Sequence, residues 1–122
     1  RGVYAIGLHN RSRPTKSYRA LEQIKPITYV RDNSKDSKLD FELYSDMITD
    51  HNSDKFETSN SKTNIHRASK WKTLLNVGLY SAGCQVIQKP NRFDDFMNLC
   101  ELQVNWGQGA TFSYTLLEEK DF

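Results

Sequence analysis

The spacing of apolar residues predicts one long helix in the last third of the chain. An apolar stripe recurs at intervals of three and four residues and consists of Phe93, Phe96, Met97, Cys100 and Val104. Asn91 stands before the stripe as a good N-cap residue, and the carboxylates of Asp94 and Asp95 suit the positive end of the helix dipole. The pattern therefore predicts a helix over about residues 91–105.

Short runs of β-branched and aromatic residues predict strands elsewhere. These runs cover residues 3–9, 27–30, 62–68, 83–88 and 111–117. Residues 18–24 are expected to form a brief helical turn before Pro26. The sum is a mainly β (α+β) fold in which one helix packs on the strands, and we expect a single domain over residues 1–122.

Composition and charge limit the kinds of binding partner that are expected. The chain has 122 residues, of which 37% are hydrophobic, enough for one modest core. Its 17 basic and 15 acidic residues are mixed along the sequence, so no basic face for nucleic acid is expected. No apolar run approaches the roughly 20 residues that a membrane-spanning helix needs. The start on Arg1 without methionine suggests a fragment of a longer chain.

An acidic segment over residues 32–43 partly matches a calcium-binding loop. Positions 1, 3, 5 and 9 of that loop are occupied by Asp32, Ser34, Asp36 and Asp40. Ser37 replaces the glycine of position 6, and Leu43 replaces the glutamate of position 12. The pattern favours a solvated acidic turn over a weak or vestigial ion site, and we expect neither a metal nor another cofactor.

The two cysteines have different contexts. Cys100 belongs to the apolar stripe of the helix, where a free cysteine behaves as a small hydrophobic residue. Cys84 follows Ser81-Ala82-Gly83 and opens the strand at 83–88, where small neighbours let backbone N–H groups approach a reacting carbonyl. Cys84 is therefore the candidate nucleophile.

A thiol needs a neighbouring base to react well at neutral pH, because its ordinary pKa is about 8.5. His66 lies on a separate predicted strand and is the candidate base. Alternation along that strand puts Asn64 and His66 on one face and Ile65 and Arg67 on the other. A partner that is distant in sequence is the usual arrangement for a Cys–His pair.

Fourteen residues, 67 to 80, separate His66 from Ser81-Ala82-Gly83-Cys84. This pattern resembles the signature of the L,D-transpeptidase catalytic-domain family: a histidine, a gap of fourteen to seventeen residues, then Ser or Thr, His, Gly and Cys. The match covers His66, Ser81, Gly83 and Cys84. Ala82 stands where the family usually has a second histidine, and Gln85-Val86 replaces a hydrophobic residue followed by Asn or Arg.

The resemblance implies a small β-sandwich or barrel and acyl transfer on peptidoglycan stem peptides. Cys84 would attack the carbonyl of the third, L-centred residue, and His66 would carry the proton to the leaving D-amino acid. Backbone N–H groups near Gly83 and Cys84 would stabilise the oxyanion. Ser81 is either a local orienter or a turn-capping serine. Transpeptidation and L,D-carboxypeptidase hydrolysis both remain open, and the implied location is extracytoplasmic: periplasm, cell wall, or delivery by a phage or secretion particle.

Further residues are candidates for substrate binding. The Arg67 guanidinium could pair with a substrate carboxylate, although its predicted direction favours a surface role. Tyr80 and Gln85 are candidates for lining the cleft, with Trp71 as another aromatic in the same connection. His9, at the end of the first predicted strand, is a second candidate for a catalytic role. The alternative is a solvated or hydrogen-bonded histidine without such a role.

Two other classes of function compete with this interpretation. One is a non-catalytic cell-wall or protein-binding module in which Cys84 is only a small residue at a tight turn. The other is a cysteine peptidase acting on ordinary proteins, which ranks lower because the sequence around Cys84 lacks the local signature of that class. The sequence leaves the oligomeric state open.

Overall fold

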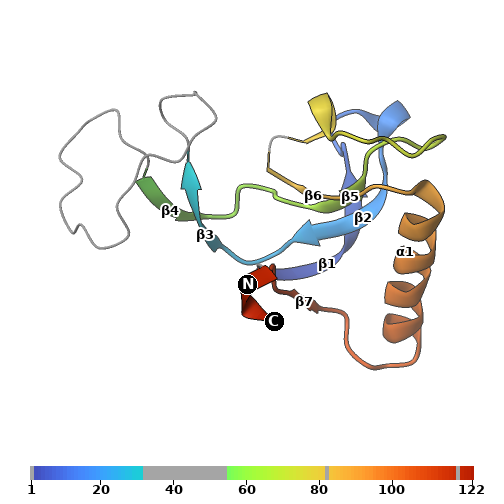
Figure 1. Cartoon of the computed structure of the whole chain (residues 1–122). Helices are drawn as coiled ribbons and strands as arrows, with labels where there is room; N and C mark the ends of the chain where they lie inside the picture. Colours follow the sequence, from blue (N-terminus) through green and yellow to red (C-terminus); the bar gives the residue numbers. More distant parts are fainter. Residues whose placement is uncertain (1, 32–54, 82, 118) are drawn as a thin grey trace. The chain divides into compact units, whose positions relative to one another are not determined.

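The computed structural model describes residues 2–31, 55–81, 83–117 and 119–122 (Figure 1). The predicted acidic loop at 32–43 lies outside these ranges. The chain forms two compact units, one made of Arg1–Lys25 and Asn60–Phe122, the other of Pro26–Ser59. Each unit is described by itself.

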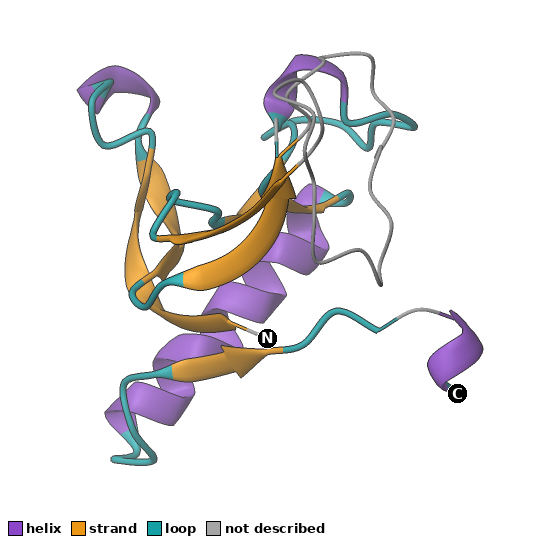
Figure 2. Ribbon diagram, turned by 90° about the vertical axis from the view of Figure 1, so that its left-hand side faces the viewer, coloured by secondary structure: helices purple, strands orange, loops and turns teal. Residues whose placement is uncertain are grey.

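The larger unit contains a five-stranded mixed sheet. Its strands are β1 (Gly2–His9), β2 (Tyr18–Gln23), β5 (Ile65–Arg67), β6 (Gln85–Ile87) and β7 (Phe112–Tyr114). They lie in the order β6-β5-β2-β1-β7, with β5 and β6 parallel and the other pairs antiparallel. The sheet is curled into a half-barrel (Figure 2). The prediction of a mainly β fold with one packed helix is confirmed.

Strand β2 occupies the centre of this sheet, where the sequence predicted a helical turn. It pairs with β1 from Tyr4↔Gln23 to His9↔Tyr18 and with β5 through Leu21↔Ile65. The helical turn expected at 18–24 is therefore wrong. Local propensity over six residues is a weak preference, and pairing along both edges overrides it. A connection containing the short 3-10 helix η1 (Pro14–Lys16) joins β1 to β2.

The helix α1 (Pro90–Asn105) covers the sheet against β2, β5 and β6 (Figures 1 and 2). It begins at Pro90, one residue before the predicted start, because proline lacks the N–H that the first turn would leave unpaired and its fixed φ suits the helix. The predicted stripe supplies its buried residues. The core of the unit consists of Tyr4, Ala20, Leu21, Ile65, Phe93, Met97 and Cys100.

Strands β5 and β6 confirm the predicted runs at 62–68 and 83–88 in shorter form. Ile65 pairs with Gln85, His66 with Val86 and Arg67 with Ile87. The connection between these parallel strands contains the 3-10 helix η2 (Gly78–Tyr80). The predicted strand at 111–117 is present as β7, and a last 3-10 helix, η3, covers Glu119–Asp121.

The smaller unit contains an antiparallel pair, β3 (Ile27–Arg31) and β4 (Lys55–Ser59). The sequence predicted β3 but not β4, whose Lys-Phe-Glu-Thr-Ser has little β-branched character. Cross-strand bonds link the two strands: Thr28 Oγ1 lies 2.8 Å from Thr58 Oγ1, and the Tyr29 hydroxyl donates to Glu57 Oε2 at 3.0 Å. Cross-strand polar pairs of this kind stabilise a two-stranded sheet.

Among the described residues, no helix combines the length and the apolar character that crossing a membrane requires.

Replacing Phe93 with alanine tests whether the helix stripe supports the larger unit. Phe93 is 1% exposed, and we expect the Phe93→Ala variant to lose about 3–5 kcal/mol of unfolding free energy, because a large buried ring leaves a cavity. Urea denaturation followed by circular dichroism measures the change. Leu99→Ala, on the same helix but 66% exposed, is the matched control and should change stability by less than about 0.5 kcal/mol. Equal losses in the two variants would contradict the assignment of this core.

Candidate functional site

The imidazole of His66 is held in one tautomer by the backbone of its own strand. Its Nδ1 lies 2.6 Å from the carbonyl oxygen of Arg67, and His66 is only 1% exposed. A carbonyl oxygen can only accept, so Nδ1 carries the proton and donates. In the neutral ring, Nε2 then holds the free lone pair.

Tyr18 reinforces this arrangement from the first position of β2. Its hydroxyl donates to the same Arg67 carbonyl at 3.0 Å and lies 3.3 Å from His66 Nδ1. The carbonyl oxygen has two lone pairs and can accept both bonds. Burial raises the pKa of Tyr18, so the hydroxyl keeps its proton over the ordinary pH range.

The Nε2 atom of His66 is buried and has no hydrogen-bond partner among the residues that the structure describes. An unpaired buried polar atom costs about 1–3 kcal/mol, and folded proteins contain few of them. β5 thus fixes the His66 ring through Nδ1 and leaves the basic Nε2 without a hydrogen-bond partner in the described part of the structure. Such a nitrogen can accept a proton from a nearby acid.

His9 lies flat against His66. The two ring centroids are 3.9 Å apart and the ring planes differ by 13°. Burial, followed by the charges of His66 and Arg67, lowers the pKa of His9 to about 4. Burial also lowers the pKa of His66, although the bond to the Arg67 carbonyl opposes this. Both rings are therefore neutral at pH 7.

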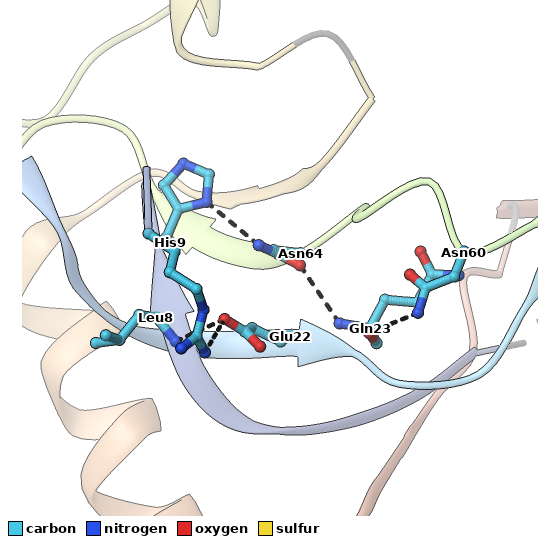
Figure 3. Close-up of polar contacts among 7 residues, drawn as sticks. Leu8, His9, Glu22, Gln23, Asn60 and Asn64 are labelled. Carbon is cyan, nitrogen blue, oxygen red and sulfur yellow. Dashed lines mark hydrogen bonds and ion pairs between the residues drawn. The ribbon is translucent and has the colours of Figure 1, made fainter. Parts of the chain in front are cut away.

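Asn64 connects His9 to the centre of the sheet (Figure 3). Its Nδ2 lies 3.5 Å from His9 Nδ1, and its Oδ1 accepts the backbone N–H of Gln23 at 3.3 Å. The sequence predicted that Asn64 and His66 share a face of their strand. It did not predict that His9 would join them, because that contact depends on the register of β1, β2 and β5.

Cys84 lies immediately before β6, and its thiol bonds to the backbone before β5. Its sulfur accepts the N–H of Asn64 at 3.3 Å and donates to the carbonyl of Lys62 at 3.6 Å. In the described part of the chain, no hydrogen bond joins this thiol to His66. The two residues nevertheless sit on neighbouring parallel strands, since Cys84 comes two positions before Val86, the register partner of His66.

Ser81 organises the turn that carries Cys84. Its hydroxyl donates to the Cys84 carbonyl at 2.9 Å and accepts the Gly83 N–H at 3.1 Å. These bonds fit both predicted roles, a local orienter and a turn-capping serine. The second bond also occupies the Gly83 N–H, one of the two backbone donors predicted for an oxyanion site.

The candidate substrate-binding residues are dispersed. The Arg67 guanidinium lies 3.7 Å from the centroid of the Tyr18 ring, so this half-buried side chain makes a cation–π contact that alternation alone did not predict. Gln85 Oε1 accepts the Tyr114 hydroxyl at 3.2 Å. Tyr80 is 49% exposed and Trp71 is 84% exposed. None of these contacts assigns a ligand, and the binding roles remain predictions.

An open hollow of about 220 Å³ lies beside β6, next to the connection from β5. It is lined by Ala68, Leu74, Leu75, Asn76, Val77, Val86 and Gln88. One of these lining residues, Val86, lies on β6, the strand that follows Cys84. Within the described ranges, no group of three or more His, Cys, Asp or Glu residues is arranged to hold a metal ion.

No family model matches the chain, and neither a curated protein nor a solved structure shows detectable similarity to it.

The depressed pKa of His9 predicts a loss of stability in mild acid. The folded-state pKa of about 4 lies below the ordinary value of 6.5, so the unfolded chain binds the proton first as pH falls. The stabilisation from neutral His9 is therefore complete above about pH 6.5 and is lost progressively toward pH 4. His9→Phe keeps an aromatic ring but cannot titrate. Between pH 7 and pH 5 the full shift would cost wild type about 1.8 kcal/mol of unfolding free energy relative to this variant, and solvent screening at the half-buried ring reduces the expected difference to about 1 kcal/mol.

Urea denaturation at intervals of half a pH unit measures the difference. The carboxylates titrate in both proteins and cancel in the comparison, which therefore reports the titration of His9 together with its coupling to His66. Parallel stability curves for wild type and His9→Phe would contradict a depressed pKa at this position.

Proposed function

We propose that this chain is a cysteine acyl-transfer enzyme that acts on the L,D-peptide bond of peptidoglycan stem peptides through a thioester on Cys84. The observation that carries the proposal is the state of His66: neutral, fixed through Nδ1, and with an unpartnered Nε2 on the strand beside β6. The spacing of His66 from Ser81-Ala82-Gly83-Cys84 supports the same assignment. An extracytoplasmic location and a peptidoglycan partner follow from this proposal.

The proposed reaction begins with transfer of the thiol proton from Cys84 Sγ to His66 Nε2. The S–H bond breaks, an N–H bond forms, and the electron pair stays on sulfur. The thiolate attacks the carbonyl carbon of the third stem-peptide residue. Collapse of the tetrahedral intermediate expels the terminal D-amino acid, whose nitrogen takes the proton back from Nε2. The Arg67 carbonyl keeps its bond to Nδ1–H throughout and stabilises the intervening imidazolium.

Backbone donors at the turn would stabilise the negative oxygen of the intermediate. The Gly83 N–H is already bonded to the Ser81 hydroxyl, which leaves the Cys84 N–H as the better-suited donor of the predicted pair. One preorganised donor of this type contributes about 3 kcal/mol in measured enzymes. The acyl group then passes from Cys84 to an acceptor amine, giving a 3,3 cross-link, or to water, giving an L,D-carboxypeptidase product. The C–S bond breaks in this step, and the proton lost by the amine or water returns through His66 to the Cys84 sulfur.

For this reaction, the Cys84 thiol must give up its hydrogen bond to the Lys62 carbonyl and bond to His66 instead. The contact from Cys84 to the Lys62 carbonyl is 3.6 Å long and involves a weak sulfur donor, so its loss costs little. Catalytic hydrogen bonds are often long or absent without substrate and form in the substrate complex. Binding of a stem peptide would supply the energy for this change.

The same contacts favour one alternative, a non-catalytic cell-wall or protein-binding module. Bonds from the Cys84 sulfur to the backbone at Lys62 and Asn64 tie the segment before β5 to the start of β6. A cysteine with this purely structural role would be unreactive. Two experiments separate the alternatives.

Incubation with tetrapeptide-bearing muropeptides, followed by mass spectrometry, tests the reaction. We expect wild type to release the terminal D-alanine or form a 3,3 dimer, and Cys84→Ala to lose this activity by at least about 1,000-fold, because no other group can form the thioester. Cys100→Ala is the matched control, since Cys100 belongs to the core of the larger unit. An unchanged muropeptide profile with wild type would reject the enzyme and favour the module.

Alkylation by iodoacetamide tests the reactivity of the two thiols directly. Burial raises the pKa of Cys100, which is 5% exposed, so this thiol should react slowly in the folded protein. We expect Cys84 to react at least about tenfold faster than Cys100 at pH 6–7, because His66 can take its proton. Peptide mass spectrometry of timed samples measures both rates. Equally slow alkylation at the two positions would support the module.

A further inference from the structure

A second histidine covers one ring face of the proposed base. His9 is the last residue of β1 and stacks on His66 with the ring centroids 3.9 Å apart and the planes 13° from parallel. His66 is almost completely buried, while His9 is half-buried. His9 is neither the donor nor the acceptor of the proton that passes to His66 Nε2, so its contact with His66 requires a separate explanation.

The contacts of Asn64 fix the protonation state of His9. The backbone N–H of Gln23 can only donate, so the Asn64 atom that faces it at 3.3 Å must be Oδ1. The amide nitrogen then faces His9, 3.5 Å from Nδ1 (Figure 3). This nitrogen is a donor, so Nδ1 acts as the acceptor in this long contact. The contact therefore favours a neutral His9 with its proton on Nε2.

A further contact, with Tyr18, holds the His9 ring in place. The register pairs His9 with Tyr18, and the two rings lie 5.4 Å apart at 58°. Tyr18 in turn reaches His66 Nδ1 and the Arg67 carbonyl. One aromatic residue thus contacts both histidines, and rotation of either ring would break contacts with it.

A neutral ring next to His66 matters most when His66 becomes charged. The Arg67 guanidinium lies over Tyr18, and its charge opposes a charge on His66. No ion pair joins a carboxylate to either imidazole in the part of the chain that the structure describes. The face of a neutral aromatic ring attracts a cation at this distance, whereas a protonated His9 would repel it.

We propose that His9 is a positioning residue for acyl transfer: its neutral ring fixes the plane of His66 and stabilises the imidazolium that forms when His66 takes the Cys84 proton. This inference rests on the proposed function of Cys84 and His66. His9 itself touches neither substrate nor the reacting sulfur. It acts through the stacked face of His66.

The test compares two replacements of similar size. His9→Phe keeps an aromatic face against His66, whereas His9→Leu fills the space without one. Leu8→Ala is the matched control, because Leu8 is the preceding residue of β1 and alternation points it to the opposite face. All variants are made in a Cys100→Ala background, and circular dichroism checks their folding. If His9→Leu does not fold, His9→Gln, also non-aromatic, takes its place.

Two readouts are measured for each variant: the alkylation rate of Cys84 by iodoacetamide at pH 7, and kcat and KM for release of D-alanine from tetrapeptide muropeptides. We expect His9→Leu to lower the alkylation rate and kcat by about 3- to 10-fold with KM unchanged, the range for one lost aromatic contact. His9→Phe should stay within about twofold of the parent, and Leu8→Ala should match it.

Two results would overturn the inference. If His9→Leu behaves like the parent, the stack has no role; if His9→Phe falls as far as His9→Leu, the ring nitrogens act instead of the ring face. Failure of the proposed function gives a different result, because the parent protein itself would then leave muropeptides unchanged. The alkylation series still decides in that case whether His9 supports proton transfer from Cys84 to His66.

Discussion

Strand β2 pairs along both edges, and the contacts among the candidate residues depend on that double pairing. Its register with β1 aligns His9 with Tyr18, and its register with β5 aligns Leu21 with Ile65, which directs His66 to the face that carries Tyr18. The sheet is curled (Figure 2), and the contact between the His9 and His66 rings shows that the end of β1 and β5 approach each other on that face. Two histidines 57 positions apart in the sequence therefore meet as stacked rings.

Small residues pair on this face. Gly7 and Ala20 are register partners on β1 and β2, and alternation gives them the same face as His9 and Tyr18. A Cβ atom on Gly7 would lie 2.5 Å from the Glu22 side chain, so a larger residue there would displace the acid from the sheet. Ala20 is fully buried. This register pair thus carries little side-chain volume, and the space over Gly7 is occupied by the Glu22 side chain.

The two ring nitrogens of His66 differ in their hydrogen bonding. Nδ1 is satisfied by a backbone carbonyl that also accepts the Tyr18 hydroxyl, whereas Nε2 is buried without a partner among the described residues. Folded proteins retain such an atom at some cost in stability, and functional sites are where that cost is most often found. Cys84 shows the opposite pattern, because both of its hydrogen bonds are to backbone atoms and neither is to a base. The proposed reaction depends on breaking the weaker of these two bonds.

The sequence by itself determined the elements whose patterns are local. The apolar stripe from Phe93 to Val104 specified the helix, since burial of one face requires that spacing, although its last member, Val104, is exposed in the structure. The small residues around Cys84 and its distance from His66 were also readable, because they are properties of the chain. Tertiary structure alone decided that residues 18–23 form the central strand, that Arg67 stacks on Tyr18, and that His9 joins His66. The physical reason is that these contacts arise from strand register and sheet curvature, which depend on pairing between segments that are distant in sequence.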